Sequence, residues 1–98
     1  MIQLSAKHQS IVENVIKKQL TTQKVFVFGS RARNEARKFS DLDLCIAGEK
    51  LSFSQMTKLK DAFSESDLPY FVDILQEKNL SKKMFESIKK DFVALEFH

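Results

Sequence analysis

The chain has 98 residues and a net charge of +3, and 43% of its residues are hydrophobic while 30% are charged. This length predicts a single domain over residues 1–98, and the composition is that of a soluble globular protein. No stretch approaches the roughly 18 apolar residues of a membrane span, so no membrane association is expected.

A single cysteine, Cys45, cannot form a disulfide within the chain, and the N-terminal stretch lacks the basic-then-apolar pattern of a signal peptide. Both features favour the reducing cytoplasm. The mildly basic charge is compatible with an anionic ligand, but it does not by itself indicate direct nucleic-acid binding.

The N-terminal half of the chain predicts two helices and two strands. Apolar residues recur on one helical face over residues 5–20. Residues 25–28 form a continuous β-prone apolar run, which is typical of a strand covered on both faces. Gly29 ends this strand, residues 31–37 have helical propensity, and residues 41–47 form a second strand.

The C-terminal half predicts two further helices and one or two strands. A capping-box pattern begins a helix over residues 53–65, and a turn precedes a third strand over residues 70–75. Apolar spacing outlines a last helix over residues 80–88. Residues 91–97 alternate as a short strand would, although a continued helix is the competing interpretation.

This order of elements predicts an α+β fold with α/β-like features. It consists of a small mixed sheet of three to four strands flanked by helices.

Two aspartates stand in the second apolar strand, and a third stands in the next one. Because residues i and i+2 of a strand point to the same face, Asp41 and Asp43 share a face about 6–7 Å apart. Like charges at that spacing repel by roughly 2–3 kcal/mol, and a divalent cation reverses the sign. If the third strand lies beside the second, Asp73 can join them and complete a two-metal phosphoryl-transfer site.

Simpler interpretations of these aspartates remain open. Asp41 follows Ser40 and could be a turn former or a cap, and Asp73 could pair with a lysine at the edge of the core. An isolated Asp-x-Asp pattern is a weak signal, and it is the combination with the preceding turn that favours function.

The Gly29-Ser30 turn after the first strand is a candidate phosphate site. Gly29 allows close backbone approach, the Ser30 hydroxyl can donate to a phosphate oxygen, and a helix start presents free N–H groups. Ser30 could equally be only an N-cap. Of the basic residues that follow, Arg31 and Arg33 are nearest and are predicted to contact a triphosphate, since arginine binds phosphate bidentately.

The stretches "FGS", "DLDL" and "FVDIL" together resemble the signature of the DNA polymerase β-like nucleotidyltransferase superfamily. That signature is an apolar residue with Gly-Ser, about ten residues, Asp-apolar-Asp, and a carboxylate on a later strand. The intervening "RARNEARKFS" resembles the arginine-rich loop of the minimal nucleotidyltransferase (MNT) group, although Glu35-Ala36 departs from the glycine or small polar residue often found there.

The resemblance implies a polymerase β-type fold and a specific chemistry. Asp41 and Asp43 would hold two Mg²⁺ ions, and Asp73 would complete the metal site and help to activate an acceptor hydroxyl. Gly29 and Ser30 would bind the β and γ phosphates of a nucleoside triphosphate, with ATP as the donor by analogy.

The resemblance also implies a partner. Many MNT proteins are similar to the antitoxin half of a two-gene pair, in which the MNT protein transfers AMP from ATP to a tyrosine of a HEPN ribonuclease toxin. Two alternatives stay open. The chain could neutralise its partner by covering it without catalysis, or it could transfer a nucleotide to a small molecule or an RNA end.

The remaining conspicuous residues are expected to be structural. Cys45 is expected to be a buried, inert thiol, and Tyr70 is expected to pack rather than to be modified. His8 and His98 have no partner at metal-ligand spacing and are expected at the surface. The apolar tail is expected to close the core or to dock a partner.

Overall fold

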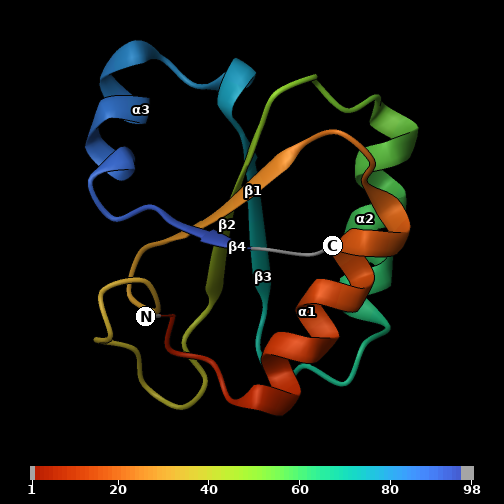
Figure 1. Ribbon diagram of the computed structural model, residues 1–98, viewed down its shortest axis with the longest axis vertical. Coiled ribbons are helices and arrows are strands. Elements are labelled where there is room, and N and C mark those ends of the chain that lie inside the picture. Colours follow the sequence, from red (N-terminus) through yellow and green to blue (C-terminus); the bar gives the residue numbers. More distant parts are fainter. Residues whose placement is uncertain (1, 96–98) are drawn as a thin grey trace.

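The computed structural model describes residues 2–95 of the chain. Three helices, four strands and one short 3₁₀ turn follow each other along it (Figure 1). The helices are α1 (Ala6–Gln19), α2 (Phe53–Ser64) and α3 (Lys82–Lys89). The strands are β1 (Lys24–Phe28), β2 (Leu42–Ala47), β3 (Val72–Gln76) and β4 (Val93–Leu95), and the 3₁₀ turn is η1 (Glu77–Asn79).

The four strands form one mixed sheet in the order β3-β2-β1-β4. β1 pairs antiparallel with both β2 and β4, whereas β2 and β3 are parallel and are joined through α2. The predicted mixed sheet flanked by helices is therefore confirmed. β3 lies directly beside β2, which is the condition on which the convergence of the aspartates depends.

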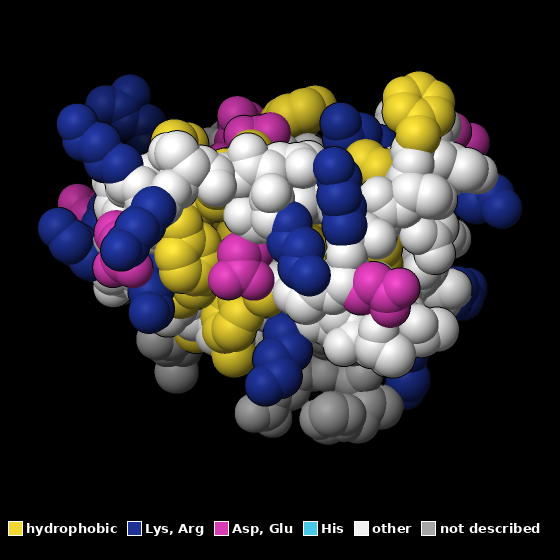
Figure 2. All heavy atoms as spheres, turned by 90° about the horizontal axis from the view of Figure 1, so that it is seen from above, with side chains coloured by type: hydrophobic (Ala, Val, Ile, Leu, Met, Phe, Trp, Pro, Cys, Tyr) yellow, Lys and Arg dark blue, Asp and Glu magenta, His cyan; other side chains and the backbone are white. Residues whose placement is uncertain are grey.

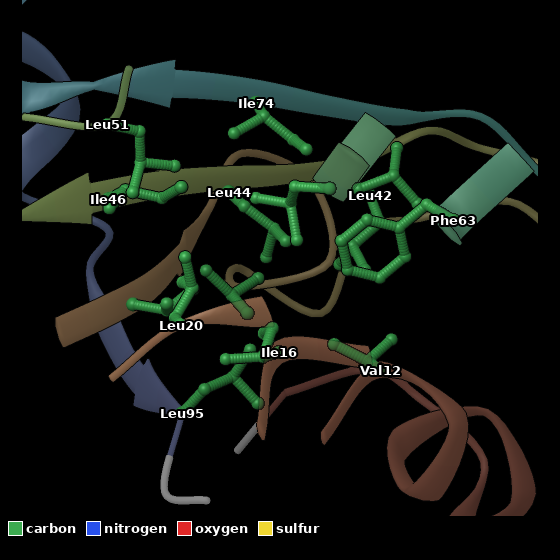
Figure 3. Packing of buried hydrophobic residues seen from close by; sticks show 14 of the residues in the cluster. Val12, Ile16, Leu20, Leu42, Leu44, Ile46, Leu51, Phe63, Ile74 and Leu95 are labelled. Carbon is green, nitrogen blue, oxygen red and sulfur yellow. The ribbon is translucent and has the colours of Figure 1, made fainter. Parts of the chain in front are cut away.

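α1 and α2 cover one face of the sheet and build the core with it. In Figure 1 these two helices lie together on one side of the strands, while α3 lies apart from them. Figure 3 shows Val12 and Ile16 of α1 and Phe63 of α2 pointing toward Leu44 of β2 and Ile74 of β3. In β2 the alternate residues Leu42, Leu44 and Ile46 are buried in this layer. Side-chain alternation along a strand therefore directs Asp43 to the opposite face.

An aromatic cluster covers part of that opposite face. The Phe92 ring stacks on Phe26 of β1 at 4.9 Å between centroids, and it also meets Phe28 and Phe85 of α3. β1 is thus covered on both faces, as its continuous apolar run predicted. The cluster fixes the segment just before β4 against the end of β1.

The helix starts follow their serines. Ser5, Ser52 and Ser81 each accept a hydrogen bond from the amide three residues on, and Ser52 forms a full capping box with Gln55. The predicted boundaries agree with the observed ones to within one or two residues. No helix within residues 2–95 is long and apolar enough to cross a membrane.

The prediction of a helix over residues 31–37 was wrong. These residues form a single turn, in which the amides of Ala32 and Arg33 both donate to the Gly29 carbonyl at 3.1 Å, followed by irregular chain. Asn34 ends the turn because it adopts a left-handed conformation with φ 61°. Bonds to distant residues, described below, replace the helical ones.

The strand prediction for the tail is confirmed over Val93–Leu95, where it pairs with β1. Leu95 is buried in the core, so this part of the tail closes the sheet. Phe97 and His98 lie outside the described residues.

Candidate active site

Asp43 and Asp73 lie side by side on the parallel strands β2 and β3. They are register partners in the sheet, so both side chains leave the same face, opposite to α1 and α2. The Leu42 amide donates to the Phe71 carbonyl at 2.9 Å, which extends the pairing to the residue after Asp41. Asp41 itself is exposed just before β2, on the same side as Asp43 by alternation. The three predicted carboxylates therefore lie near the same end of the β2–β3 pair, with Asp43 and Asp73 in register.

The pKa of Asp43 reflects its burial and its acidic neighbours. Burial raises the pKa of the partly buried Asp43 carboxyl, and the negative charges of Asp73 and then Asp41 raise it further. The charge of Arg33 acts in the opposite direction. The carboxylates thus repel each other, which is costly for folding unless a positive ligand joins them.

Gly29 is shaped to receive the Asp43 carboxylate. Phe28, the last residue of β1, is the register partner of Asp43, so Gly29 follows directly beside that carboxylate. Gly29 has φ +73°, and a Cβ at this position would collide with Oδ2 of Asp43. The backbone conformation therefore requires glycine, and a side chain at this position would also displace the Asp43 carboxylate.

The turn that starts at Gly29 resembles the first turn of a helix, although no helix follows. The Gly29 and Ser30 carbonyls accept hydrogen bonds from later amides, including that of Glu35 at 2.9 Å. Ser30 therefore caps no helix. The first amides of such a turn precede its hydrogen-bonded part, so they are the groups that can meet a ligand.

Arg31 holds the loop together from inside. Its side chain is 5% exposed and donates to three backbone carbonyls: Gln3 at 3.0 Å, Lys38 at 3.2 Å and Ser40 at 2.8 Å. Its guanidinium also lies over the Tyr70 ring, 3.8 Å from the centroid. The triphosphate contact predicted for Arg31 is not supported by this arrangement, because most of its donors are committed to the backbone.

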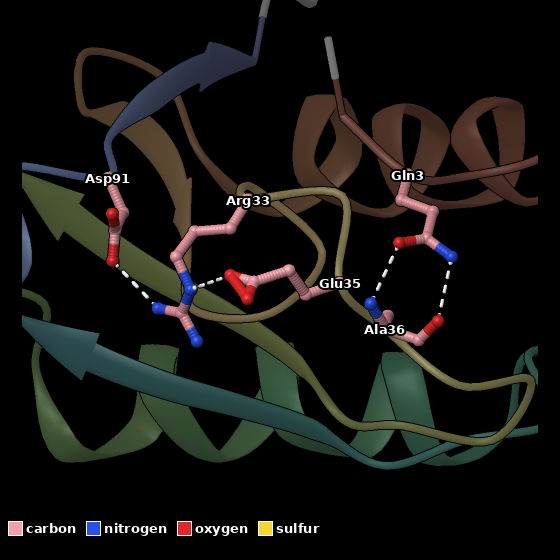
Figure 4. A network of polar contacts seen from close by, with 5 residues as sticks. All are labelled: Gln3, Arg33, Glu35, Ala36 and Asp91. Atoms are coloured by element: carbon pink, nitrogen blue, oxygen red, sulfur yellow. Dashed lines mark hydrogen bonds and ion pairs between the residues drawn. The ribbon is translucent and has the colours of Figure 1, made fainter.

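Arg33, in contrast, reaches over the face that carries the aspartates. Figure 4 shows its guanidinium in front of β2, between Glu35 and Asp91. Nε donates to Glu35 and Nη1 donates to Asp91, each at 2.8 Å. Its effect on the pKa of Asp43 places its charge within reach of that carboxylate. Arg33 therefore lies over the aspartate face, and its predicted contact with a triphosphate stays a prediction.

Two residues of this region were missed from the sequence. Gln3 forms a reciprocal pair with the backbone of Ala36, donating at 2.9 Å and accepting at 2.8 Å (Figure 4). Asp91 reaches Arg33 across 58 positions of sequence. Neither has a local signal, since a glutamine near the N-terminus and an aspartate after a helix are ordinary surface residues.

Comparison with known proteins assigns the chain to a family. The sequence model of the family described as polymerase beta, nucleotidyltransferase, matches residues 10–95, a range that includes the Gly29 turn and all three aspartates. The chain belongs to this family. Its fold and its nucleotidyltransferase class are thereby confirmed, while the roles of individual residues remain predictions.

Two similar proteins indicate to which group of the polymerase β family the chain is related. The chain is 38% identical over 96 residues to a protein of Haemophilus influenzae named "Probable protein adenylyltransferase MntA", covering 97% of this chain and 84% of that protein. It is 32% identical, with a TM-score of 0.69, to the solved structure of a candidate minimal nucleotidyltransferase, covering 89% and 88% of the two chains. The resemblance to the minimal nucleotidyltransferase group is confirmed.

A more distant structural neighbour supports the polymerase β fold alone. It is a crystal structure of a toxin–antitoxin with AMP-PNP, with a TM-score of 0.74 at 15% identity, covering 92% of this chain and 73% of that one.

The aspartate set of this polymerase β-family chain fits magnesium in its chemistry. Carboxylate oxygens are the hard ligands that Mg²⁺ prefers, and the Asp43 carboxylate lies against Gly29, where a Cβ would displace it. Among residues 2–95, however, no three acidic, histidine or cysteine side chains are grouped closely enough to hold an ion as they stand. An ion at this site would have to draw the repelling carboxylates together.

A pocket of about 300 Å³ borders the site on the side of Asp73. It lies along β3, the edge strand of the sheet, and reaches the last turns of α2. Its lining is mostly apolar and contains two charged side chains, those of Lys60 and Asp73. The lining residues are Lys60, Phe63, Ser64, Leu68, Tyr70, Phe71, Val72, Asp73 and Ile74. Phe71 is 67% exposed, so an aromatic ring is presented to solvent two residues from Asp73.

Cys45 is buried and Tyr70 is packed, as predicted. Cys45 is fully buried, and burial, with a smaller effect of Glu77, raises the pKa of its thiol to about 11, so the inert thiol form prevails. Tyr70 packs under Arg31, and its hydroxyl lies 3.2 Å from Nδ1 of His8. His8 is therefore a partner of Tyr70 rather than an isolated surface residue.

Proposed function

We propose that this chain transfers AMP from ATP to a tyrosine of a HEPN ribonuclease toxin and so acts as its antitoxin, in a magnesium-dependent reaction. The observation that carries the proposal is the register of Asp43 with Asp73 on parallel strands, beside a glycine against which the Asp43 carboxylate is seated. The name of the Haemophilus relative, a protein adenylyltransferase, supports a protein as the acceptor. The toxin–antitoxin neighbour with AMP-PNP supports the same partnership through its fold.

In this proposal each predicted site residue has a defined role. Asp41 and Asp43 hold the magnesium ions, Asp73 completes their site, and the Gly29-Ser30 turn binds the β and γ phosphates. Magnesium supplies charge neutralisation on the phosphate oxygens when it is bound. Arg33 adds a guanidinium over the same face.

The reaction is a single displacement at phosphorus. The acceptor oxygen forms a bond to the α phosphorus, the α–β anhydride bond breaks, and pyrophosphate leaves from the side of the Gly29 turn. Asp73 takes the proton of the acceptor hydroxyl. In-line geometry brings the acceptor from the side opposite to the leaving group, which is the side of β3 where the pocket borders Asp73.

The surface is consistent with a protein partner. On the face that Figure 2 shows, basic side chains are scattered among acidic and hydrophobic ones and form no continuous band. This pattern favours the expectation of no direct nucleic-acid binding, which remains a prediction.

The single-domain organisation and the cytoplasmic location also remain predictions. An unpaired cysteine such as Cys45 is stable in the reducing cytoplasm.

Labelled ATP, Mg²⁺ and the purified partner test the proposal. We expect a nucleotide mass on a partner tyrosine, which disappears when Mg²⁺ is chelated and in the double variant Asp41→Asn, Asp43→Asn. Neutralisation that survives in this variant would instead show occlusion without catalysis. Transfer to an RNA end or a small molecule in place of the partner would contradict the proposed acceptor.

A further inference from the structure

We infer that Asp91 is a positioning residue that orients the Arg33 guanidinium over the phosphate-binding end of β2. This inference rests on the proposed function, because it takes the triphosphate of that reaction as the ligand of Arg33. It assigns a role in the site to the segment between α3 and β4, which carries none of the predicted site residues.

The backbone of Arg33 is fixed beside the Gly29 turn. Its amide donates to the Gly29 carbonyl at 3.1 Å, so its Cα lies one helical turn from the glycine that receives Asp43. The side chain is 45% exposed, however, and a long exposed arginine samples many rotamers. A phosphate-binding role requires something that selects one direction for this side chain.

Asp91 selects one direction for the Arg33 side chain, because Asp91 is itself held in place by the neighbouring structure. Its carboxylate accepts from Nη1 of Arg33 at 2.8 Å, and its own side chain is only 28% exposed. Its amide donates to the Ile88 carbonyl at 3.1 Å, and the next residue, Phe92, is stacked on Phe26. Glu35 also contacts Arg33, but it is two residues away and 62% exposed, so it is a looser support.

The resulting direction points the guanidinium at the aspartate face. The bond to Asp91, and after it the bond to Glu35, raises the pKa of Arg33, and the charge of Arg33 lowers that of Asp43. Among the described residues, Nη2 of Arg33 has no hydrogen-bond partner, so it remains available to a phosphate oxygen. A cation already oriented in this way binds an anion without further loss of side-chain freedom.

An ion pair this exposed contributes little to folding, so a purely structural role for Asp91 predicts little effect of its removal on nucleotide binding. The positioning role instead predicts that removal of the Asp91 charge weakens nucleotide binding. In Asp91→Asn, the dissociation constant for the magnesium complex of a non-hydrolysable ATP analogue should rise roughly five- to tenfold. The KM for ATP should rise with it while kcat changes less, since the remote residue touches no reacting atom.

Two controls isolate the effect. Asp61→Asn makes the same chemical change at an exposed position of α2, on the other side of the sheet, and should leave binding unchanged. In an Arg33→Gln background, Asp91→Asn should cause no further loss, because Asp91 acts through Arg33. Thermal melts verify that each variant is folded.

The outcomes separate this inference from the proposed function. Wild-type-like or tighter binding by Asp91→Asn, or an equal loss in the Arg33→Gln background, overturns the positioning role and leaves the proposed function intact. An unaltered chain that binds no magnesium triphosphate overturns both.

Discussion

The Asp43 side chain combines three conditions that oppose its ionisation: partial burial, the neighbouring charge of Asp73, and that of Asp41. Its pKa in the folded state is raised above the ordinary value of 3.8. A raised carboxyl pKa means that protonation stabilises the fold. This contribution is fully present below the unfolded pKa and is lost as pH rises through the folded one. At neutral pH the ionised Asp43 therefore destabilises the chain.

The substitution Asp43→Asn tests whether the ionised carboxylate destabilises the folded chain. In the absence of divalent cations at pH 7, we expect the substitution to increase the free energy of unfolding by about 1 kcal/mol, because it removes the repulsion. The gain should shrink as pH falls toward 3.8, the ordinary pKa. Urea unfolding across pH measures it, with Asp61→Asn as the matched control. A loss of stability at pH 7 would show that the carboxylate is structural.

The two glycines with positive φ provide a matched pair for the Gly29 turn. Gly29→Ala adds backbone strain and a collision with the Asp43 carboxylate, whereas a Cβ at Gly48 (φ +103°) would meet its nearest neighbour at 3.7 Å. We expect Gly48→Ala to cost about 1–2 kcal/mol and Gly29→Ala clearly more, with loss of nucleotide binding. Denaturant unfolding and calorimetry check both. Equal costs at the two positions would contradict the close seating of Asp43.

At the scale of elements, the loop between β1 and β2 is organised by long-range bonds rather than by a helix. Arg31 binds three carbonyls, and Gln3 pairs with Ala36 across 33 positions. The N-terminal segment before α1 is therefore part of the scaffold of the site.

Arg31→Lys tests the role of this loop scaffold. Lysine keeps the charge but cannot donate to three carbonyls in the arrangement of a guanidinium, so we expect a loss of about 2–3 kcal/mol. Arg37→Lys changes the same residue type at an exposed position of the same loop and should cost little. Thermal unfolding compares them. Equal melting temperatures would return Arg31 to the candidate phosphate ligands.

The regular elements could be predicted because their signals are local. The capping box at Ser52 locates the start of α2, and apolar periodicity of 3.6 or 2 residues locates α1 and the strands. The loop after β1 could not, since helical propensity at residues 31–37 is overridden by tertiary bonds of Arg31 and by the left-handed Asn34. The contact of Asp91 could not be predicted for the same reason, because its partner Arg33 is 58 residues away in the sequence.

At the scale of the whole molecule, topology turns isolated aspartates into a candidate site. The crossover through α2 makes β3 parallel to β2 and brings Asp73 into register with Asp43. Two carboxylates within apolar strands predicted this convergence, because uncompensated charges there are costly. Strand order and register could not be read from the chain itself. α1 and α2 then occupy the opposite face, and the aromatic cluster with Phe85 of α3 covers only the part of the carboxylate face over β1.

Calorimetric titration of the full chain with a non-hydrolysable ATP analogue, with and without Mg²⁺, is the most direct test of the central claim. The account predicts binding that requires Mg²⁺ and that Asp43→Asn abolishes, because triphosphate and carboxylates meet only through the cation. Binding that is independent of Mg²⁺, or undiminished by Asp43→Asn, would contradict it.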